Sequence, residues 1–164
     1  HDTDHYIVFK PESFQQVAPT QLYRAEEKLL YRFICNQLVF VFFNRKTLSL
    51  NSCNILIPQI PGVAIKFVMA VLNSRIAQFY FKKTFHSVKV LRSHIELIPI
   101  PVADKVAQEN IIQLADLLIS ATDENTIIEI YDKIDWKMAE IYNLSREEYI
   151  LIQKSMREEN LFLF

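Results

Sequence analysis

Glycine is nearly absent from this chain, since Gly62 is the only one among 164 residues. Loops that wrap a phosphate or a dinucleotide need several glycines, because the backbone must approach the ligand closely there. The sequence therefore excludes a P-loop, a dinucleotide-binding turn and an S-adenosylmethionine loop, and we expect no cofactor. With 51% hydrophobic residues, the chain has enough apolar material for one well-packed domain, or for a core with a helical appendage.

Short apolar runs rich in β-branched and aromatic residues fill the first part of the chain and predict strands. The runs 28–34 and 38–43 are separated by only three residues, which indicates a β-hairpin, and 16–21 is typical of a linker. From Ile65 the apolar residues recur at helical spacing, with Asn73-Ser74 acting as a kink or a new N-cap. The strands expected from the sequence are 6–9, 28–34, 38–43, 48–57, 88–91 and 95–100.

After Val102 the apolar spacing is helical throughout and predicts three helices. The last of them opens with Ser145-x-x-Glu148, a capping box. The expected fold is therefore α+β: a small, mostly antiparallel sheet with one or two packed helices, followed by an all-helical C-terminal segment. We divide the chain into a leading segment (1–22), a sheet-containing domain (23–102) and a helical segment (103–164).

Charge is divided unevenly between these parts. Up to Val102 there are twelve Lys and Arg against six Asp and Glu, a net +6, whereas from Ala103 onward there are six against thirteen, a net −7. Such asymmetry suggests one half that faces a polyanion and another that faces solvent or protein. Ordinary solvated surfaces explain the same asymmetry about equally well.

The segment 79–92 interleaves aromatic, cationic and small hydroxyl side chains, a pattern that suits DNA. Lys and Arg can hold phosphates, and Arg, Asn and His can reach base edges. The aromatic residues here are better explained as core, because they recur at helical spacing. The lysines after them either contact phosphates or cap a helix C-terminus.

A second candidate is Asn44-Arg45-Lys46-Thr47, which we place at a hairpin tip and which an ordinary polar turn explains equally well. Asn51, Ser52 and Asn54 interrupt an apolar strand and either read bases or satisfy neighbouring backbone. The complete set of candidate DNA-binding residues is Arg45, Lys46, Arg75, Lys82, Lys83, His86, Ser87, Lys89 and Arg92.

Four stretches of the sequence resemble a known family: "EKLLYRFICNQLVFVFF", "LNSCNILIP", "AVLNSRIAQFYFKK" and "VKVLRSHIELIPIP". Together they resemble the TaqI-like specificity domain, the C-terminal target-recognition part of many adenine-N6 DNA methyltransferases and fused type IIG restriction-modification enzymes. The later "IDWKMAEIYNLSREEYILI" is similar to the helical closing segment of the same proteins. The resemblance implies that the chain reads double-stranded DNA for a methyltransferase domain that precedes it in the same polypeptide, in the bacterial cytoplasm.

Catalysis is disfavoured by what the sequence lacks. Adenine methylation needs an Asn/Asp-Pro-Pro-aromatic tetrapeptide, and the chain has no Pro-Pro pair. The four histidines have no metal-ligand spacing, and no apolar run is long enough to cross a membrane. We therefore expect no catalytic residue, no metal site and no membrane partner. The chain starts at His1 without Met, which led us to expect a fragment of a longer protein.

Two alternatives to DNA recognition stay open. The acidic helices of 103–164, together with the apolar end Leu161-Phe162-Leu163-Phe164, would suit a protein-interaction module. The triplet Glu26-Glu27-Lys28 faintly matches half of a metal-dependent nuclease site, although such triplets are commonplace. The two cysteines, Cys35 and Cys53, lack C-x-x-C spacing and are expected to be free, buried thiols in a reducing compartment.

Overall fold

The computed structural model describes residues 8–44, 47–49 and 52–158 of the chain. Three antiparallel strands form its sheet, namely β1 (Lys28–Arg32), β2 (Phe40–Phe43) and β3 (Cys53–Leu56), in the order β2-β1-β3. Leu29 in the central strand lies opposite Phe42 on one side and Leu56 on the other. The predicted hairpin between the first two strands is confirmed.

Helices make up most of the rest of the described chain, and the expected α+β class is confirmed. A short 3-10 turn, η1 (Pro11–Ser13), and α1 (Thr20–Tyr23) precede the sheet. The helices after the sheet are α2 (Ile65–Asn73), α3 (Arg75–Thr84), α4 (Arg92–Ile95), α5 (Lys105–Ser120), α6 (Glu124–Ile141) and α7 (Arg146–Glu158).

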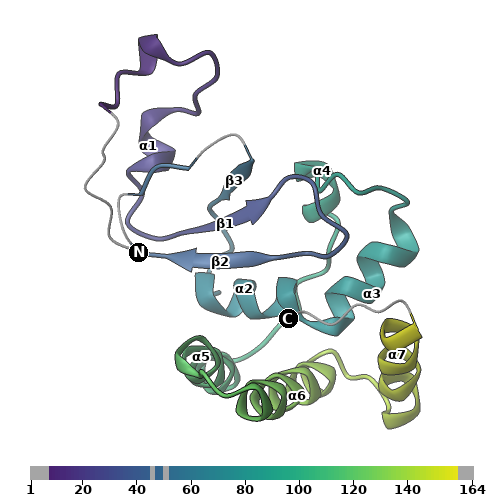
Figure 1. Cartoon of the computed structure of the whole chain (residues 1–164). Coiled ribbons are helices and arrows are strands. Elements are labelled where there is room, and N and C mark those ends of the chain that lie inside the picture. The colour runs from purple at the N-terminus through teal and green to yellow at the C-terminus, as the bar shows by residue number, and fades with distance from the viewer. Residues whose placement is uncertain (1–7, 45–46, 50–51, 159–164) are drawn as a thin grey trace.

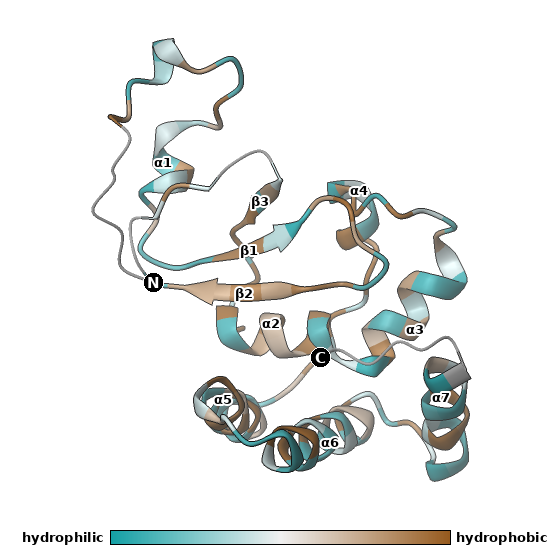
Figure 2. Cartoon of the chain, viewed as in Figure 1, coloured by the Kyte–Doolittle hydropathy of each residue, from teal (hydrophilic) through white to brown (hydrophobic). Residues whose placement is uncertain are grey.

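The elements are arranged in layers, which Figure 1 shows from the side. Helix α2 covers one face of the sheet, α5 and α6 lie beyond α2, and α7 packs on α3. The fully buried side chains Leu29, Phe67 and Ile111 come from these successive layers. In Figure 2 the β2 ribbon is brown, as expected for a strand with Phe40 in the core. One apolar core therefore joins the sheet to the C-terminal helices.

Two side-chain amides fasten β2 and the residue two positions before it to the helices beneath. Asn73 accepts a hydrogen bond from Phe40 N (2.9 Å) and donates one to Phe40 O (2.8 Å). Gln78 does the same with Leu38 N and Leu38 O, both at 2.8 Å. β2 is an edge strand of the sheet, and an amide supplies the donor and acceptor that a neighbouring strand would otherwise supply.

The interruption at Asn73-Ser74 is a new N-cap, one of the two outcomes we expected. Ser74 ends α2 in extended backbone, and its hydroxyl accepts a hydrogen bond from Ala77 N in the first turn of α3. The predicted capping box is also confirmed, because Ser145 and Glu148 each accept from the other's backbone N–H. Both helix starts are local features that a sequence specifies directly.

Several predicted strands were wrong. Residues 95–100 form no strand; instead α4 ends at Ile95 and an irregular segment follows it. Residues 88–91 contribute a single bridge, between Lys89 and Ile34. Within the described part of the strand predicted at 48–57, only Cys53–Leu56 is a strand. Short apolar runs fit a buried turn or short helix as well as a strand, and only packing decides between them.

The leading part of the chain also departs from expectation. Tyr6 and Ile7 of the predicted strand 6–9 lie outside the described residues, and Val8 and Phe9 belong to no strand. The predicted linker 16–21 runs into α1 at its end. The phenol of Tyr23 accepts a hydrogen bond from Ala18 N at 3.1 Å, which fixes this segment beside the sheet.

The cysteines were predicted only in part. Cys35 and Cys53 are free, as expected, but both are half-buried rather than fully buried.

In the described part of the chain, no helix has the length and apolar character needed to cross a membrane. The apolar end at 161–164 lies outside the described residues.

Candidate nucleic-acid interface

The basic segment 82–92 leaves α3 at its C-terminal end and crosses to α4 at one end of the sheet (Figure 1). Lys82 and Lys83 occupy the last turn of α3, where cations interact favourably with the helix carbonyls. The Lys83 ammonium also lies 5.7 Å from the centre of the Phe79 ring. Phe79 itself packs against the core, as the helical spacing predicted.

Aromatic stacking fixes the segment after α3. The ring of Phe85 stacks on His94 with 4.3 Å between centres, and Phe81 lies 5.3 Å from Phe85 beneath them. Phe81 is only 2% exposed. The exposed His86 and the half-buried Ser87 come directly after this anchor. The backbone just before His86 and Ser87 is therefore held by the stacked rings of Phe85 and His94.

Backbone hydrogen bonds attach the second half of the segment to the continuation of β1. Cys35 N donates to Val88 O at 3.0 Å, and Val90 N donates to Phe33 O at 2.8 Å. These bonds flank the antiparallel bridge between Ile34 and Lys89. The Ser87 hydroxyl accepts from Lys89 N at 3.0 Å and so supports the turn just before the bridge.

Arg32 joins this site, although the sequence analysis did not select it. It is the last residue of β1 and is exposed, opposite Cys53 in the neighbouring strand. Because Phe33 bonds to Val90, the end of β1 lies beside the chain that leads into Arg92. The available signal was strand alternation: Arg32 points to the face opposite that of the buried Leu29 and Tyr31, where an exposed charged residue is expected.

Arg92 stands at the start of α4 with its side chain 85% exposed. Its Nε donates a 2.6 Å hydrogen bond to Glu96 one turn later, and this bond raises the pKa of Arg92. Both side chains border a groove of about 590 Å³ whose wall includes the buried Ile95 and Ile98. Arg92 is thus largely exposed and is oriented by a hydrogen bond to Glu96.

Arg75 lies apart from these residues. Its guanidinium pairs with Asp132 at 2.5 Å and with Asp135 at 2.9 Å, and it lies 4.7 Å from the centre of the Tyr131 ring. Its side chain is 18% exposed. Burial raises the pKa of the Asp135 carboxyl to about 7, against the opposing effect of Arg75. Arg75 therefore ties α3 to α6 within the protein.

The second candidate segment is only partly described. Arg45 and Lys46 lie outside the described residues, as does Asn51. The strand order β2-β1-β3 places β2 and β3 on opposite sides of β1, so these two consecutive strands do not pair with each other as a hairpin. Lys28 of the suspected nuclease triplet is fully buried and donates to Tyr23 O at 2.5 Å. Burial lowers the pKa of this ammonium.

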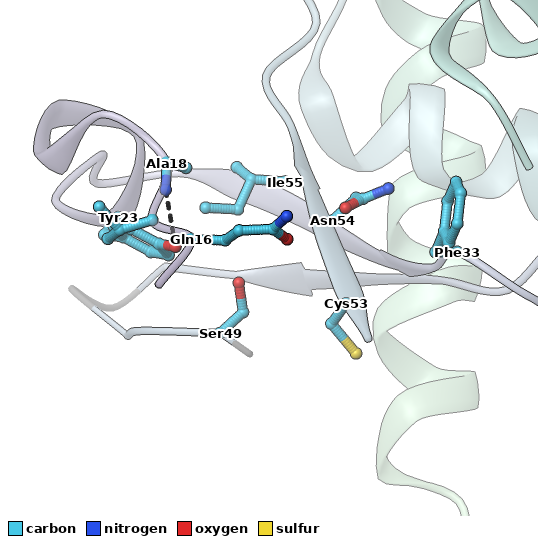
Figure 3. Close-up of a pocket in the computed structure, with 9 residues that line it drawn as sticks. Gln16, Ala18, Tyr23, Phe33, Ser49, Cys53, Asn54 and Ile55 are labelled. Carbon is cyan, nitrogen blue, oxygen red and sulfur yellow. Dashed lines mark hydrogen bonds between the residues drawn. The ribbon is translucent and has the colours of Figure 1, made fainter. Parts of the chain in front are cut away.

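A hollow of about 390 Å³ lies between the N-terminal segment and β3. Figure 3 shows the Gln16 side chain extending toward β3, with the Ser49 hydroxyl directed toward it. Asn54 also lines the hollow, and its amide donates a long, 3.4 Å hydrogen bond to Tyr31 Oη. This hollow offers polar groups next to Cys53, the residue opposite Arg32.

Basic and acidic residues are found in different layers of the molecule. The exposed cations Arg32, Lys83, Lys89 and Arg92 belong to β1, the end of α3, the segment bridged to Ile34 and the start of α4. The acidic helices α5 and α6 lie beyond α2 (Figure 1). Within the described ranges, no group of three or more His, Cys, Asp or Glu is placed to hold a metal. The fold and this surface define a basic, sheet-containing module joined to an acidic helical layer.

Comparison with known families identifies the module. The model of the TaqI-like C-terminal specificity domain matches residues 2–100, and the chain belongs to this family. The match covers the sheet, α2, α3 and α4, and so includes the whole basic surface. No curated protein matches the chain. The family has a DNA-recognition role in restriction-modification enzymes, and a specificity domain is itself non-catalytic.

Proposed function

We propose that this chain gives sequence specificity to an adenine-N6 DNA methyltransferase or a fused type IIG restriction-modification enzyme. One observation carries the proposal. Within the part matched by the family, exposed cations from three separate elements lie together at one end of the sheet: Arg32 on β1, Lys89 beside Ile34, and Arg92 on α4. A surface of this kind neutralises phosphates, and its affinity for DNA depends steeply on salt.

The proposed contacts are of two kinds. Lys82, Lys83 and Lys89 hold phosphates and set the position of the domain on the duplex, because ammonium groups act as point charges. Arg92, His86 and Ser87 present groups that reach base edges. Arg32 is added to the predicted set. Arg75 is assigned to the ion pairs with α6, and Arg45 and Lys46 stay in the proposal as predicted contacts outside the described residues.

The division of the chain follows from the same proposal. Residues 23–102 form the recognition unit, 1–22 lead into it, and the helical segment 103–164 supports it against the methyltransferase domain that precedes it in the polypeptide. The helical segment is firmly attached: Lys66 on α2 pairs with Asp116 on α5 at 2.7 Å, and Gln108 accepts from Ala64 N at 3.0 Å. The proposed setting is the bacterial cytoplasm, with no cofactor bound to this chain.

The experiment is fluorescence anisotropy of the 164-residue chain with random-sequence duplex DNA over a salt series. It is repeated on a variant with Lys82, Lys83, Lys89 and Arg92 replaced by Glu. A matched control carries the same charge change on the helical segment, with exposed Lys105, Lys133, Lys137 and Lys154 replaced by Glu.

We expect the wild type to lose affinity steeply with salt and the first variant to lose most of its salt slope, by about 0.9 for each phosphate contact removed. The control should keep the larger part of that slope, because its charges lie away from the proposed surface. Equal losses in the two variants would show that only net charge matters, and would contradict the assignment of this surface.

A second candidate function has one observation in its favour. Large apolar side chains are exposed on the helical segment, among them Leu117 (56%), Ile119 (64%) and Leu151 (63%). Exposed apolar side chains in numbers mark interaction surfaces. If the 164-residue chain binds no duplex even at low salt, the protein-interaction reading takes the place of the DNA-binding one.

A further inference from the structure

Glu96 is the single acidic residue in a long basic stretch. Between Glu27 and Asp104 the sequence contains ten lysines and arginines and no other Asp or Glu. An exposed carboxylate on a surface that faces phosphates weakens binding by repulsion. The one acid retained there is the one that hydrogen-bonds to Arg92, at 2.6 Å. This coincidence needs a physical reason.

The backbone that carries the Arg92–Glu96 pair is held in place by packing. Val90 is 1% exposed, Ile95 7% and Ile98 4%, so buried side chains lie on both sides of the pair. In the middle of α4, the His94 ring is stacked on Phe85 at 4.3 Å. A side chain on such a support projects in a defined direction, which is what precise recognition needs.

The hydrogen bond to Glu96 leaves a defined part of the guanidinium available. Glu96 accepts from Nε, and this is the only hydrogen bond of the Arg92 side chain to any described residue. The two terminal nitrogens, Nη1 and Nη2, make no hydrogen bond to a described residue, so their donors remain for a ligand and form a planar fork. A planar fork of two N–H donors matches the O6 and N7 acceptors of guanine in the major groove.

We propose that Arg92 reads a guanine in the bound DNA and that Glu96 is its positioning residue. The carboxylate fixes the fork and offsets the charge of Arg92, so that the arginine gains less from a phosphate and more from a base edge. The inference rests on the proposed function and names one element of the recognised site, a G·C pair.

Replacement of Glu96 has two effects of opposite sign, which a merely structural role would not produce. Removing the acid strengthens binding to any phosphate backbone, and at the same time it frees the guanidinium and weakens selection of the base. Glu96→Gln separates the two effects, because the amide oxygen still accepts from Nε but carries no charge.

The test is selection from a randomised duplex library by the 164-residue chain, together with anisotropy on one fixed random-sequence duplex at low salt. The variants are Arg92→Ala, Glu96→Ala and Glu96→Gln. Glu129→Ala is the matched control, since Glu129 and Lys133 form an exposed pair with the same four-residue spacing at 2.7 Å on α6. Thermal unfolding of each variant is recorded alongside.

We expect the wild type to select a G·C pair that Arg92→Ala selects about tenfold less strongly. Glu96→Ala should lose at least about threefold at that same pair and bind the random duplex roughly two- to fivefold more tightly. Glu96→Gln should keep the preference within about twofold and still bind the random duplex more tightly. The control should match the wild type in both assays, and melting temperatures should be nearly unchanged because exposed pairs contribute little.

Each other outcome overturns the proposal in a recognisable way. If Glu96→Ala selects DNA as the wild type does, Glu96 has no positioning role, while the proposed function stands. If Glu96→Ala loses the preference but Arg92→Ala keeps it, Glu96 itself contacts the base. If the wild type shows no salt-dependent binding to any duplex, the proposed function fails, and this inference fails with it.

Discussion

Replacing Asn73 with Ala tests how the edge strand β2 is held to the helices. The Asn73 amide makes two hydrogen bonds with the backbone of Phe40, at 2.9 and 2.8 Å, and Phe40 is 2% exposed. Ala leaves this N–H and this C=O without their partner. An unsatisfied buried polar group costs about 1–3 kcal/mol. Two such groups would cost roughly 2–6 kcal/mol, but Asn73 is itself half-buried, so water can replace part of the interaction. We therefore expect a loss of roughly 2–4 kcal/mol in the free energy of unfolding.

The measurement is urea unfolding of the 164-residue chain at pH 7, followed by circular dichroism, with Asn110→Ala as the control. Asn110 is an exposed amide on α5, and its replacement should change the unfolding free energy by less than about 0.5 kcal/mol. Hydrogen exchange gives an independent check, since the Phe40 amide should lose protection before the amides of β1 do. A loss below about 0.5 kcal/mol for Asn73→Ala, with Phe40 still protected, would refute the reasoning.

Three further outcomes follow from local contacts. Ser74→Ala removes the N-cap of α3 and should destabilise the protein by about 0.5–2 kcal/mol in the same assay; Ser74→Thr, which keeps the hydroxyl, should lose less. Tyr142→Phe removes the 2.6 Å bond to Pro99 O and should lose about 0.5–1.5 kcal/mol; no loss would mean that water replaces the phenol. Burial raises the pKa of Asp135 to about 7, so between about pH 4 and 7 the folded protein holds a proton that the unfolded chain has released. The free energy of unfolding of the wild type, measured relative to that of Asp135→Asn, should therefore fall as pH rises through this window; a difference that rises instead would show that Arg75 keeps the carboxylate ionised.

Local signals in the sequence predicted a substantial part of this protein. Three features could be predicted because each depends on residues within a few positions of one another. They are the hairpin of β1 and β2, the new helix at Ser74 and the capping box at Ser145. The family resemblance was equally legible, because it rests on contiguous stretches. The basic character of the site could also be predicted from the sequence, because the numbers of Lys, Arg, Asp and Glu in a segment do not depend on the fold.

Tertiary structure decided which of those charges share a surface. Arg75 and Lys82 lie on the same short helix, yet Arg75 is drawn into ion pairs with Asp132 and Asp135, which lie some sixty residues further along the chain. Arg32 joins the site only because the chain after β1 bonds to Val90. The run 95–100 was predicted as a strand, but packing on the core turns its start into the end of α4. The spacing and type of neighbouring residues determine local conformation, so the sequence predicts it. Which side chains from distant parts of the chain come into contact depends on tertiary packing, and no short sequence pattern specifies it.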